Sequence, residues 1–108
     1  MSSSAYNPSV CNHSIVAANA TGIGTSAGVA SDRYNHGMQV IITGSVSVLV
    51  VKLQGTIDGT HWVDLTSWTY GTQASGDIVS AQAALVAVVA NITSYTGSGT
   101  VDVYITGN

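Results

Sequence analysis

The residues best suited to chemistry lie in one short segment, Leu53–Leu65, with the sequence LQGTIDGTHWVDL. It holds Asp58, His61 and Trp62 within five positions. A histidine oriented by a carboxylate can act as a general base, but such catalysis also needs a nucleophile in reach. The segment carries no nucleophile motif such as Gly-x-Ser-x-Gly. We therefore expect no catalytic residues and predict that the protein is not an enzyme.

Metal and phosphate chemistry also find little support in the sequence. His13, His36 and His61 are scattered, and their spacing matches no known ligand pattern. The glycine-rich segment Thr21–Gly28 lacks the lysine of a phosphate-binding loop, and no convincing helix follows it. Cys11 is the single cysteine, so it cannot form a disulfide within the chain. We expect neither a metal nor a cofactor.

A turn and an aromatic anchor give the segment a simpler interpretation. Asp58-Gly59 is a strong hairpin signal, because both residues tolerate the backbone of a type I′ turn. The return strand would then begin near His61, with Trp62 and Asp64 on one face. Aromatic side chains near such turns can anchor an interface or stack on a sugar. Both readings stay open for Trp62, Trp68, Tyr70 and Tyr95.

The composition bounds the class of protein. The chain has 108 residues, which suits one domain, and 6% are charged where about 25% is usual. Lys52 and Arg33 are its two basic residues, and the net charge is −3. Binding to phosphate backbones or anionic lipids needs several basic side chains, so we expect neither a nucleic acid nor a membrane as partner. So few surface charges favour association with other proteins, including a homodimer or homotrimer.

The residue types and turns outside this segment indicate an all-β protein. Valine, isoleucine and threonine are frequent, glycine turns recur, and only residues 80–84 suggest a helical turn. We predict a single β-sandwich, jelly-roll-like, of about six to eight strands. It would span residues 13–108, behind an extended N-terminal arm of residues 1–12. The expected strands are 13–20, 29–34, 38–43, 46–56, 61–68, 77–80, 84–93 and 100–106, with a turn at 34–37.

One predicted strand changes its apolar phase midway. Val46, Val48 and Val50 share one face, whereas Leu49 and Val51 share the other. Either burial on both faces or a β-bulge would explain this pattern.

Two segments resemble small virion proteins of tailed bacteriophages. LQGTIDGTHWVDL resembles their element x-x-G-S-x-D-G-T-x-W-x-x-L, and ALVAVVANITSYTGSGTVDVYITGN resembles their C-terminal strand pair, which begins with a run such as R-Y-V-R-V-N-V-T-S. Ala87 and Ala90 stand where arginine is common in those proteins. The resemblance, which runs from about Val48 to the end, implies a jelly-roll capsid decoration (cement) protein. Such a protein would sit on the outer capsid surface of the virion, bind the major capsid protein and bridge capsomers.

Contact residues are predicted in two groups. The first lies in the arm, at Tyr6, Pro8 and Val10. The second consists of the aromatic residues Trp62, Trp68, Tyr70 and Tyr95. The alternative is a carbohydrate- or receptor-binding module of a phage fibre or tail, because a similar DGTxW hairpin occurs in discoidin-like carbohydrate-binding domains. There Trp62, Trp68 and Tyr95 would stack on sugars.

Overall fold

The computed structural model describes residues 12–26, 29–30 and 34–107, and it contains strands and no helix in that part of the chain. Seven strands have five residues or more, and two have only two. The predicted all-β fold is confirmed. The strands are β1 (Asn12–Ala20), β2 (Gly24–Thr25), β3 (Val29–Ala30), β4 (Asn35–Thr43), β5 (Val46–Thr56), β6 (Val63–Thr69), β7 (Ile78–Gln82), β8 (Ala87–Gly97) and β9 (Thr100–Gly107).

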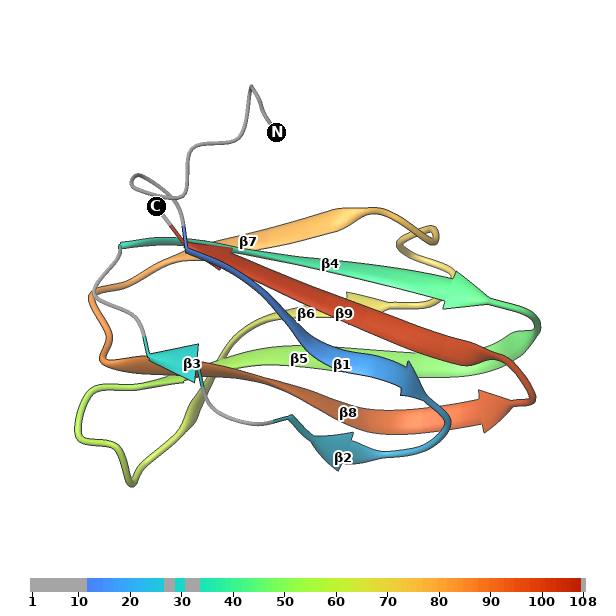
Figure 1. The fold of residues 1–108 in the computed structure, drawn as a ribbon, viewed down its shortest axis with the longest axis horizontal. Helices are drawn as coiled ribbons and strands as arrows, with labels where there is room; N and C mark the ends of the chain where they lie inside the picture. The colour runs from blue at the N-terminus through green and yellow to red at the C-terminus, as the bar shows by residue number, and fades with distance from the viewer. Residues whose placement is uncertain (1–11, 27–28, 31–33, 108) are drawn as a thin grey trace.

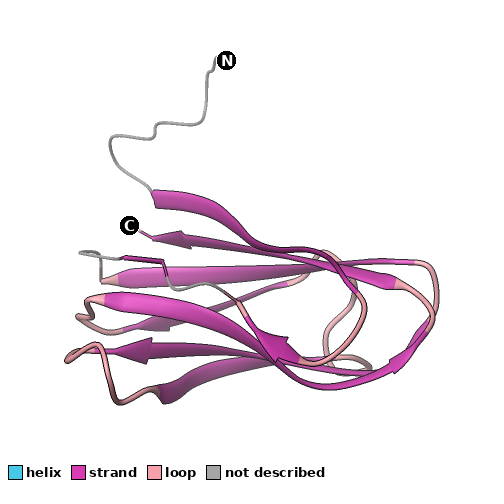
Figure 2. Ribbon diagram, turned by 60° about the horizontal axis from the view of Figure 1, so that its bottom comes forward, coloured by secondary structure: helices cyan, strands magenta, loops and turns pink. Residues whose placement is uncertain are grey.

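The strands form two antiparallel sheets, which we name sheet A and sheet B (Figure 1). Sheet A has the order β1-β9-β4-β7, and sheet B has the order β2-β8-β5-β6, with β3 also paired to β8. From β6 onward the chain crosses to the other sheet at every connection. This order is that of a jelly roll, in which two Greek keys wrap around one core. Figure 2 shows the strands lying in two layers.

Strand alternation builds the core between the sheets. On β9, Val101, Val103 and Ile105 are buried, as their spacing predicts. Their neighbours on β4, β5 and β8 complete one apolar cluster, in which Trp68 is the largest fully buried side chain. Burial of each valine, leucine or isoleucine of this cluster contributes about 1.5–3 kcal/mol to the stability of the fold.

A β-bulge accounts for the phase change on β5. The pairing of β5 with β8 shifts between Val46 and Val48. Val46 and Leu49 therefore both face the core, whereas Val48 is 45% exposed. Of the two explanations offered by the sequence, the bulge is correct.

Two local predictions are wrong. The turn predicted at residues 34–37 is largely strand, because β4 begins at Asn35 and pairs with β7 on one side and β9 on the other. The helical turn predicted at residues 80–84 is also wrong, since Ser80–Gln82 belongs to β7. In both places, pairing with neighbouring strands outweighs local propensity.

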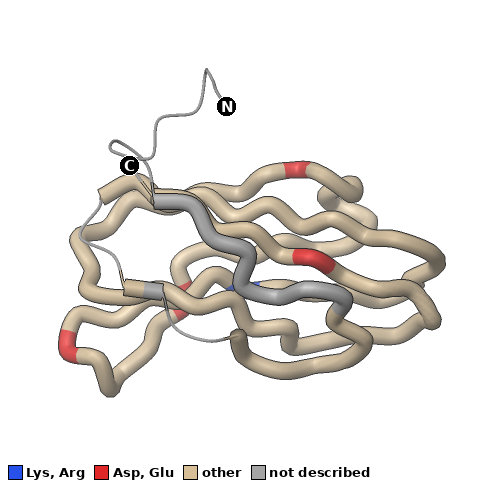
Figure 3. Tube along the Cα trace, in the orientation of Figure 1, with Lys and Arg blue, Asp and Glu red and all other residues tan. Residues whose placement is uncertain are grey.

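The remaining predictions concern the ends and the surface of the chain. Of the predicted arm, only Asn12 is described, and it opens β1. Charged positions are few and scattered over the described part of the chain (Figure 3). No helix long and apolar enough to cross a membrane occurs among the described residues.

Candidate binding site at one end of the sandwich

The loop between β5 and β6 is longer than the two-residue turn that the sequence predicts. The hairpin is confirmed, since β5 pairs with β6 in antiparallel fashion. The two-residue turn is wrong: β5 ends at Thr56 and β6 begins at Val63, so the six residues Ile57–Trp62 connect them. Gly59 has a φ of 82°, a conformation that favours glycine.

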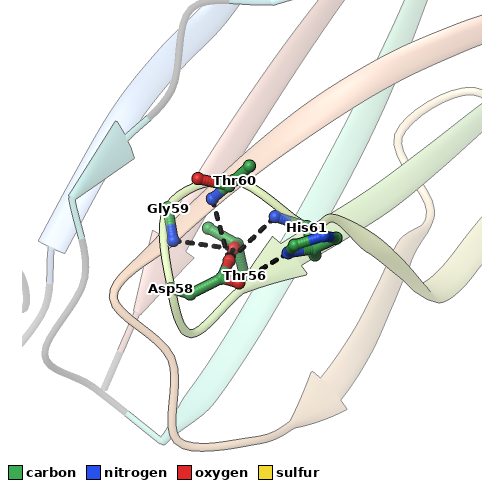
Figure 4. A network of polar contacts seen from close by, with 5 residues as sticks. All are labelled: Thr56, Asp58, Gly59, Thr60 and His61. Carbon is green, nitrogen blue, oxygen red and sulfur yellow. Dashed lines mark hydrogen bonds and ion pairs between the residues drawn. The ribbon is translucent and has the colours of Figure 1, made fainter.

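The carboxylate of Asp58 organises this loop (Figure 4). Its Oδ1 accepts hydrogen bonds from the backbone amides of Thr60 and His61, each at 2.8 Å. Its Oδ2 lies 2.6 Å from Nδ1 of His61. The Thr56 hydroxyl donates to Oδ1 at 3.1 Å and accepts from the amide of Gly59 at 3.0 Å. The loop is thus held by its own polar atoms.

These contacts fix the charge of the carboxylate. The backbone hydrogen bond from His61 lowers the pKa of Asp58 most, followed by the His61 side chain and the Thr60 amide. The pKa lies far below its ordinary value of 3.8, so Asp58 is ionised at neutral pH. Because Asp58 accepts hydrogen bonds from residues of its own loop, the Asp58–His61 pair stabilises the conformation of this loop.

An apolar hollow opens between the sheets beside this loop. It has a volume of about 440 Å³, and its lining includes Gly55, Val63, Leu65 and Leu85. A Cβ atom on Gly55 would lie 2.6 Å from Cδ1 of Leu85 and 3.0 Å from Cδ1 of Leu65. The absence of a side chain at Gly55 therefore lets Leu85, from the connection between β7 and β8, fold over β5.

Ile57 and Val63 line the hollow and are exposed, and Trp62 and Val86 are exposed neighbours of lining residues along the chain. Ile57 is 73% exposed, Val63 58% and Trp62 38%. Val86 is 48% exposed, and its amide donates to the carbonyl of Thr56 at 2.9 Å, which ties the connection between β7 and β8 to the end of β5. This connection and the loop between β5 and β6 lie at the same end of the sandwich (Figure 1). We call this surface the end patch, defined by Ile57, Trp62, Val63, Leu85 and Val86.

The four predicted aromatic contacts do not form one surface. Trp62 belongs to the end patch. Tyr70 is 46% exposed but follows the far end of β6, about 26 Å away along the strand. Tyr95 is half-buried, and its hydroxyl donates to the carbonyl of Gly99. A joint stacking platform of these residues is therefore not formed.

Trp68 requires a correction as a surface contact. Its side chain is 0% exposed, so it is a core residue and cannot touch a partner or a sugar in this fold. The predicted arm contacts Tyr6, Pro8 and Val10 lie outside the described residues.

Asp64 contacts side chains of the neighbouring strand β5. It accepts hydrogen bonds from Nζ of Lys52 at 2.9 Å and from Nε2 of Gln54 at 2.7 Å. The hydrogen bond from Lys52 is the main cause that lowers the pKa of Asp64, and the one from Gln54 adds to it. This cluster lies on the outer face of sheet B, away from the core.

One motif escaped the sequence reasoning. Gly24–Gly28 reads GTSAG, which matches Gly-x-Ser-x-Gly. A nucleophile elbow needs a strand followed directly by a helix. Ser26 instead follows the two-residue strand β2, and its hydroxyl accepts a hydrogen bond from the amide of Ala90 at 3.0 Å. The hydroxyl thus helps to fasten this segment to β8.

The two histidines whose side chains are described, His36 and His61, remain separate. His36 is 2% exposed, and its Nε2 lies 3.2 Å from the carbonyl of Ala83. His61 belongs to the Asp58 loop. In the part of the chain that the structure describes, no group of three or more His, Cys, Asp or Glu side chains is placed to hold a metal ion.

Comparison with known proteins adds the fold relationship. No protein-family model and no curated protein match the chain in sequence. Two solved structures share its fold. The SPBc2 prophage-derived protein YomS is similar at 16% identity with a TM-score of 0.64, over 90% of this chain and 93% of YomS. The PBSX exported protein XepA is similar at 17% identity with a TM-score of 0.69, again over 90% of this chain. The chain spans 37% of XepA.

Proposed function

We propose that the protein is a bacteriophage virion protein that works by binding alone, as a decoration protein on the outer capsid surface. The observation that carries this proposal is the end patch. Its residues Ile57 and Trp62 are exposed on the loop that Asp58 holds in place, and Val63 and Val86 are exposed beside that loop. Soluble proteins rarely expose clusters of apolar side chains, and where they do, the cluster commonly marks an interaction site.

The phage assignment rests on two independent likenesses. The sequence resembles small virion proteins of tailed phages, and the fold is shared with YomS and XepA, whose names mark them as prophage-derived and PBSX proteins. The jelly roll is also a common architecture of viral capsid proteins.

The physics of the surface suits a protein partner. Burying an exposed Ile or Val contributes about 1.5–3 kcal/mol, less the cost of association. Few charges surround the end patch, so a partner would desolvate few ions there. A modest contact of this kind gains strength when many copies bind one lattice. Each copy would then clamp neighbouring capsomers.

Cosedimentation with capsids of the encoding phage, before and after expansion, tests the proposal. We expect saturable binding at a fixed ratio to the major capsid protein. Val63→Asp should weaken binding at least about tenfold, since a buried charge there costs more than 1.4 kcal/mol. Val48→Asp is the matched control, because Val48 is a similarly exposed strand valine, 45% against 58%, outside the end patch.

Each outcome decides a specific point. If Val63→Asp and Val48→Asp weaken capsid binding equally, the end patch is not part of the interface. Deleting residues 2–10 should abolish capsid binding with the domain still folded, and full occupancy by the truncated protein would overturn a role for the arm. Binding to neither capsid form, with glycan binding lost on Trp62→Ala, would instead establish the fibre or tail module.

A further inference from the structure

The edges of the two sheets differ in how they are protected from pairing with another strand. Natural sheets blunt their edges with bulges, charges or very short strands. The pairing of β1 with β9 shifts register twice. β6 carries a bulge opposite Leu53 and Gln54 and the exposed charge of Asp64. β2 and β3 have two residues each.

Among the described edge strands, β7 lacks these protections. Its sequence, IVSAQ, contains no charge and no proline. It pairs with β4 in an uninterrupted register from Asn35↔Gln82 to Gln39↔Ile78. Its exposed side chains are Ile78, at 66%, Ser80 and Gln82. In Figure 1, β7 lies along the outer border of sheet A.

The register shows which backbone groups of β7 point outward. Ala83 donates its amide hydrogen to the carbonyl of Tyr34, in the same register as the strand pairs. In an antiparallel pair, hydrogen-bonded positions alternate. Residues 79, 81 and 83 therefore bond toward β4, whereas Ile78, Ser80 and Gln82 direct their N–H and C=O groups away from it. These groups can bind another extended strand.

We propose that this edge binds β7 of a second copy, antiparallel and centred on Ser80, so that two four-stranded sheets become one. In this register Ser80 faces Ser80 of the second copy, and Ile78 faces its Gln82. The three outward residues of each strand then exchange six hydrogen bonds. The inference is independent of what the end patch binds.

Charge and size favour a second copy as the occupant. Asp77 directly precedes β7 and is the nearest charge along the chain. With Ser80 on the two-fold axis, the two Asp77 residues lie at opposite ends of the paired strands, about 20 Å apart along them. No like charges oppose each other. The small Ser80 side chains at the axis let the strands approach.

Sedimentation equilibrium of the full chain, from micromolar to submillimolar concentration, tests this interface. We expect a reversible dimer. Ser80→Lys places two like charges directly opposite each other, which should weaken the dimer at least about tenfold. Ser98→Lys is the control, because Ser98 is an exposed serine in the turn between β8 and β9. Circular dichroism melts confirm that both variants fold.

A cross-linking experiment tests the register. In a Cys11→Ser background, Ser80→Cys should form a disulfide dimer under mild oxidation, since hydrogen-bonded partners lie about 5.5 Å apart between Cα atoms. Gln82→Cys should not, because the two positions would be about 13 Å apart. The proposal is overturned if the wild-type chain stays monomeric, if Ser80→Lys dimerises like Ser98→Lys, or if Gln82→Cys cross-links as well as Ser80→Cys.

Discussion

Gly55 and Leu85 offer a direct test of how the end patch is built. Gly55 lies in β5, and the side chain of Leu85 covers it from the connection between β7 and β8. A Cβ atom added at Gly55 would approach Cδ1 of Leu85 to 2.6 Å. The obstructing atoms are the ends of flexible side chains, so Gly55→Ala displaces Leu85 and leaves the strand intact.

The magnitudes follow from two opposing effects. Overpacking costs about 1–3 kcal/mol, whereas replacing glycine by alanine within a strand recovers about 0.5–1 kcal/mol. Gly55→Ala should therefore lower the free energy of unfolding by about 1 kcal/mol. Leu85 is half-buried, so Leu85→Ala should cost about 2 kcal/mol, the lower end for such truncations.

The double variant separates this contact from independent effects. With Leu85 truncated, the new methyl at position 55 has room and fills part of the space. The double variant should thus be about 1–2 kcal/mol more stable than the sum of the single effects predicts. Urea unfolding, followed by the fluorescence of the buried Trp68, measures all four free energies. Additivity within about 0.5 kcal/mol would refute the packing of Leu85 over Gly55.

Two further predictions concern the core and the loop. Trp68→Ala should destabilise the fold by about 3–5 kcal/mol. Trp68→Phe should cost less than half of that, because the indole N–H is buried without a hydrogen-bond partner among the described residues and its loss breaks no hydrogen bond. Urea unfolding measures both, and a loss below about 1 kcal/mol for Trp68→Ala, roughly a third of the usual cost, would contradict its place in the core. Asp58→Asn should lower the Tm near neutral pH. Since the folded pKa of Asp58 is below 3.8, the stabilisation is complete above that pH and is lost as the pH falls through the folded pKa. The Tm difference between wild type and variant should shrink in acid, and a pH-independent difference would contradict the role of the carboxylate.

Periodicity in the sequence predicted the elements whose pattern is set locally. The last strand was expected at residues 100–106, and in β9 the alternate residues Val101 and Val103 are both 0% exposed. The phase change on β5 indicated a bulge as one of two options. Such patterns are visible because one face of each strand meets the core.

Trp68 shows why the rest could not be predicted. Counting by twos from Asp64 places Trp68 on the same outer face. The pairing of β6 with β5 instead has Asp64 opposite Gln54 and Thr66 opposite Leu53, so Leu65 is an extra residue. This bulge reverses the faces and turns Trp68 inward, opposite Val51. A bulge of this kind depends on the partner strand, which the local sequence of β6 does not specify.

The few charges of the chain explain how both proposed surfaces can coexist with a stable fold. Asp58 is held by its own loop, and Asp64 is held by Lys52 and Gln54. Both carboxylates thus stabilise local geometry. The end patch and β7 are left without charges of their own, so recognition there depends on apolar burial at the first and on backbone hydrogen bonds at the second. Because these are different interactions on different parts of the sandwich, a dimer joined through β7 would still present two end patches to a lattice.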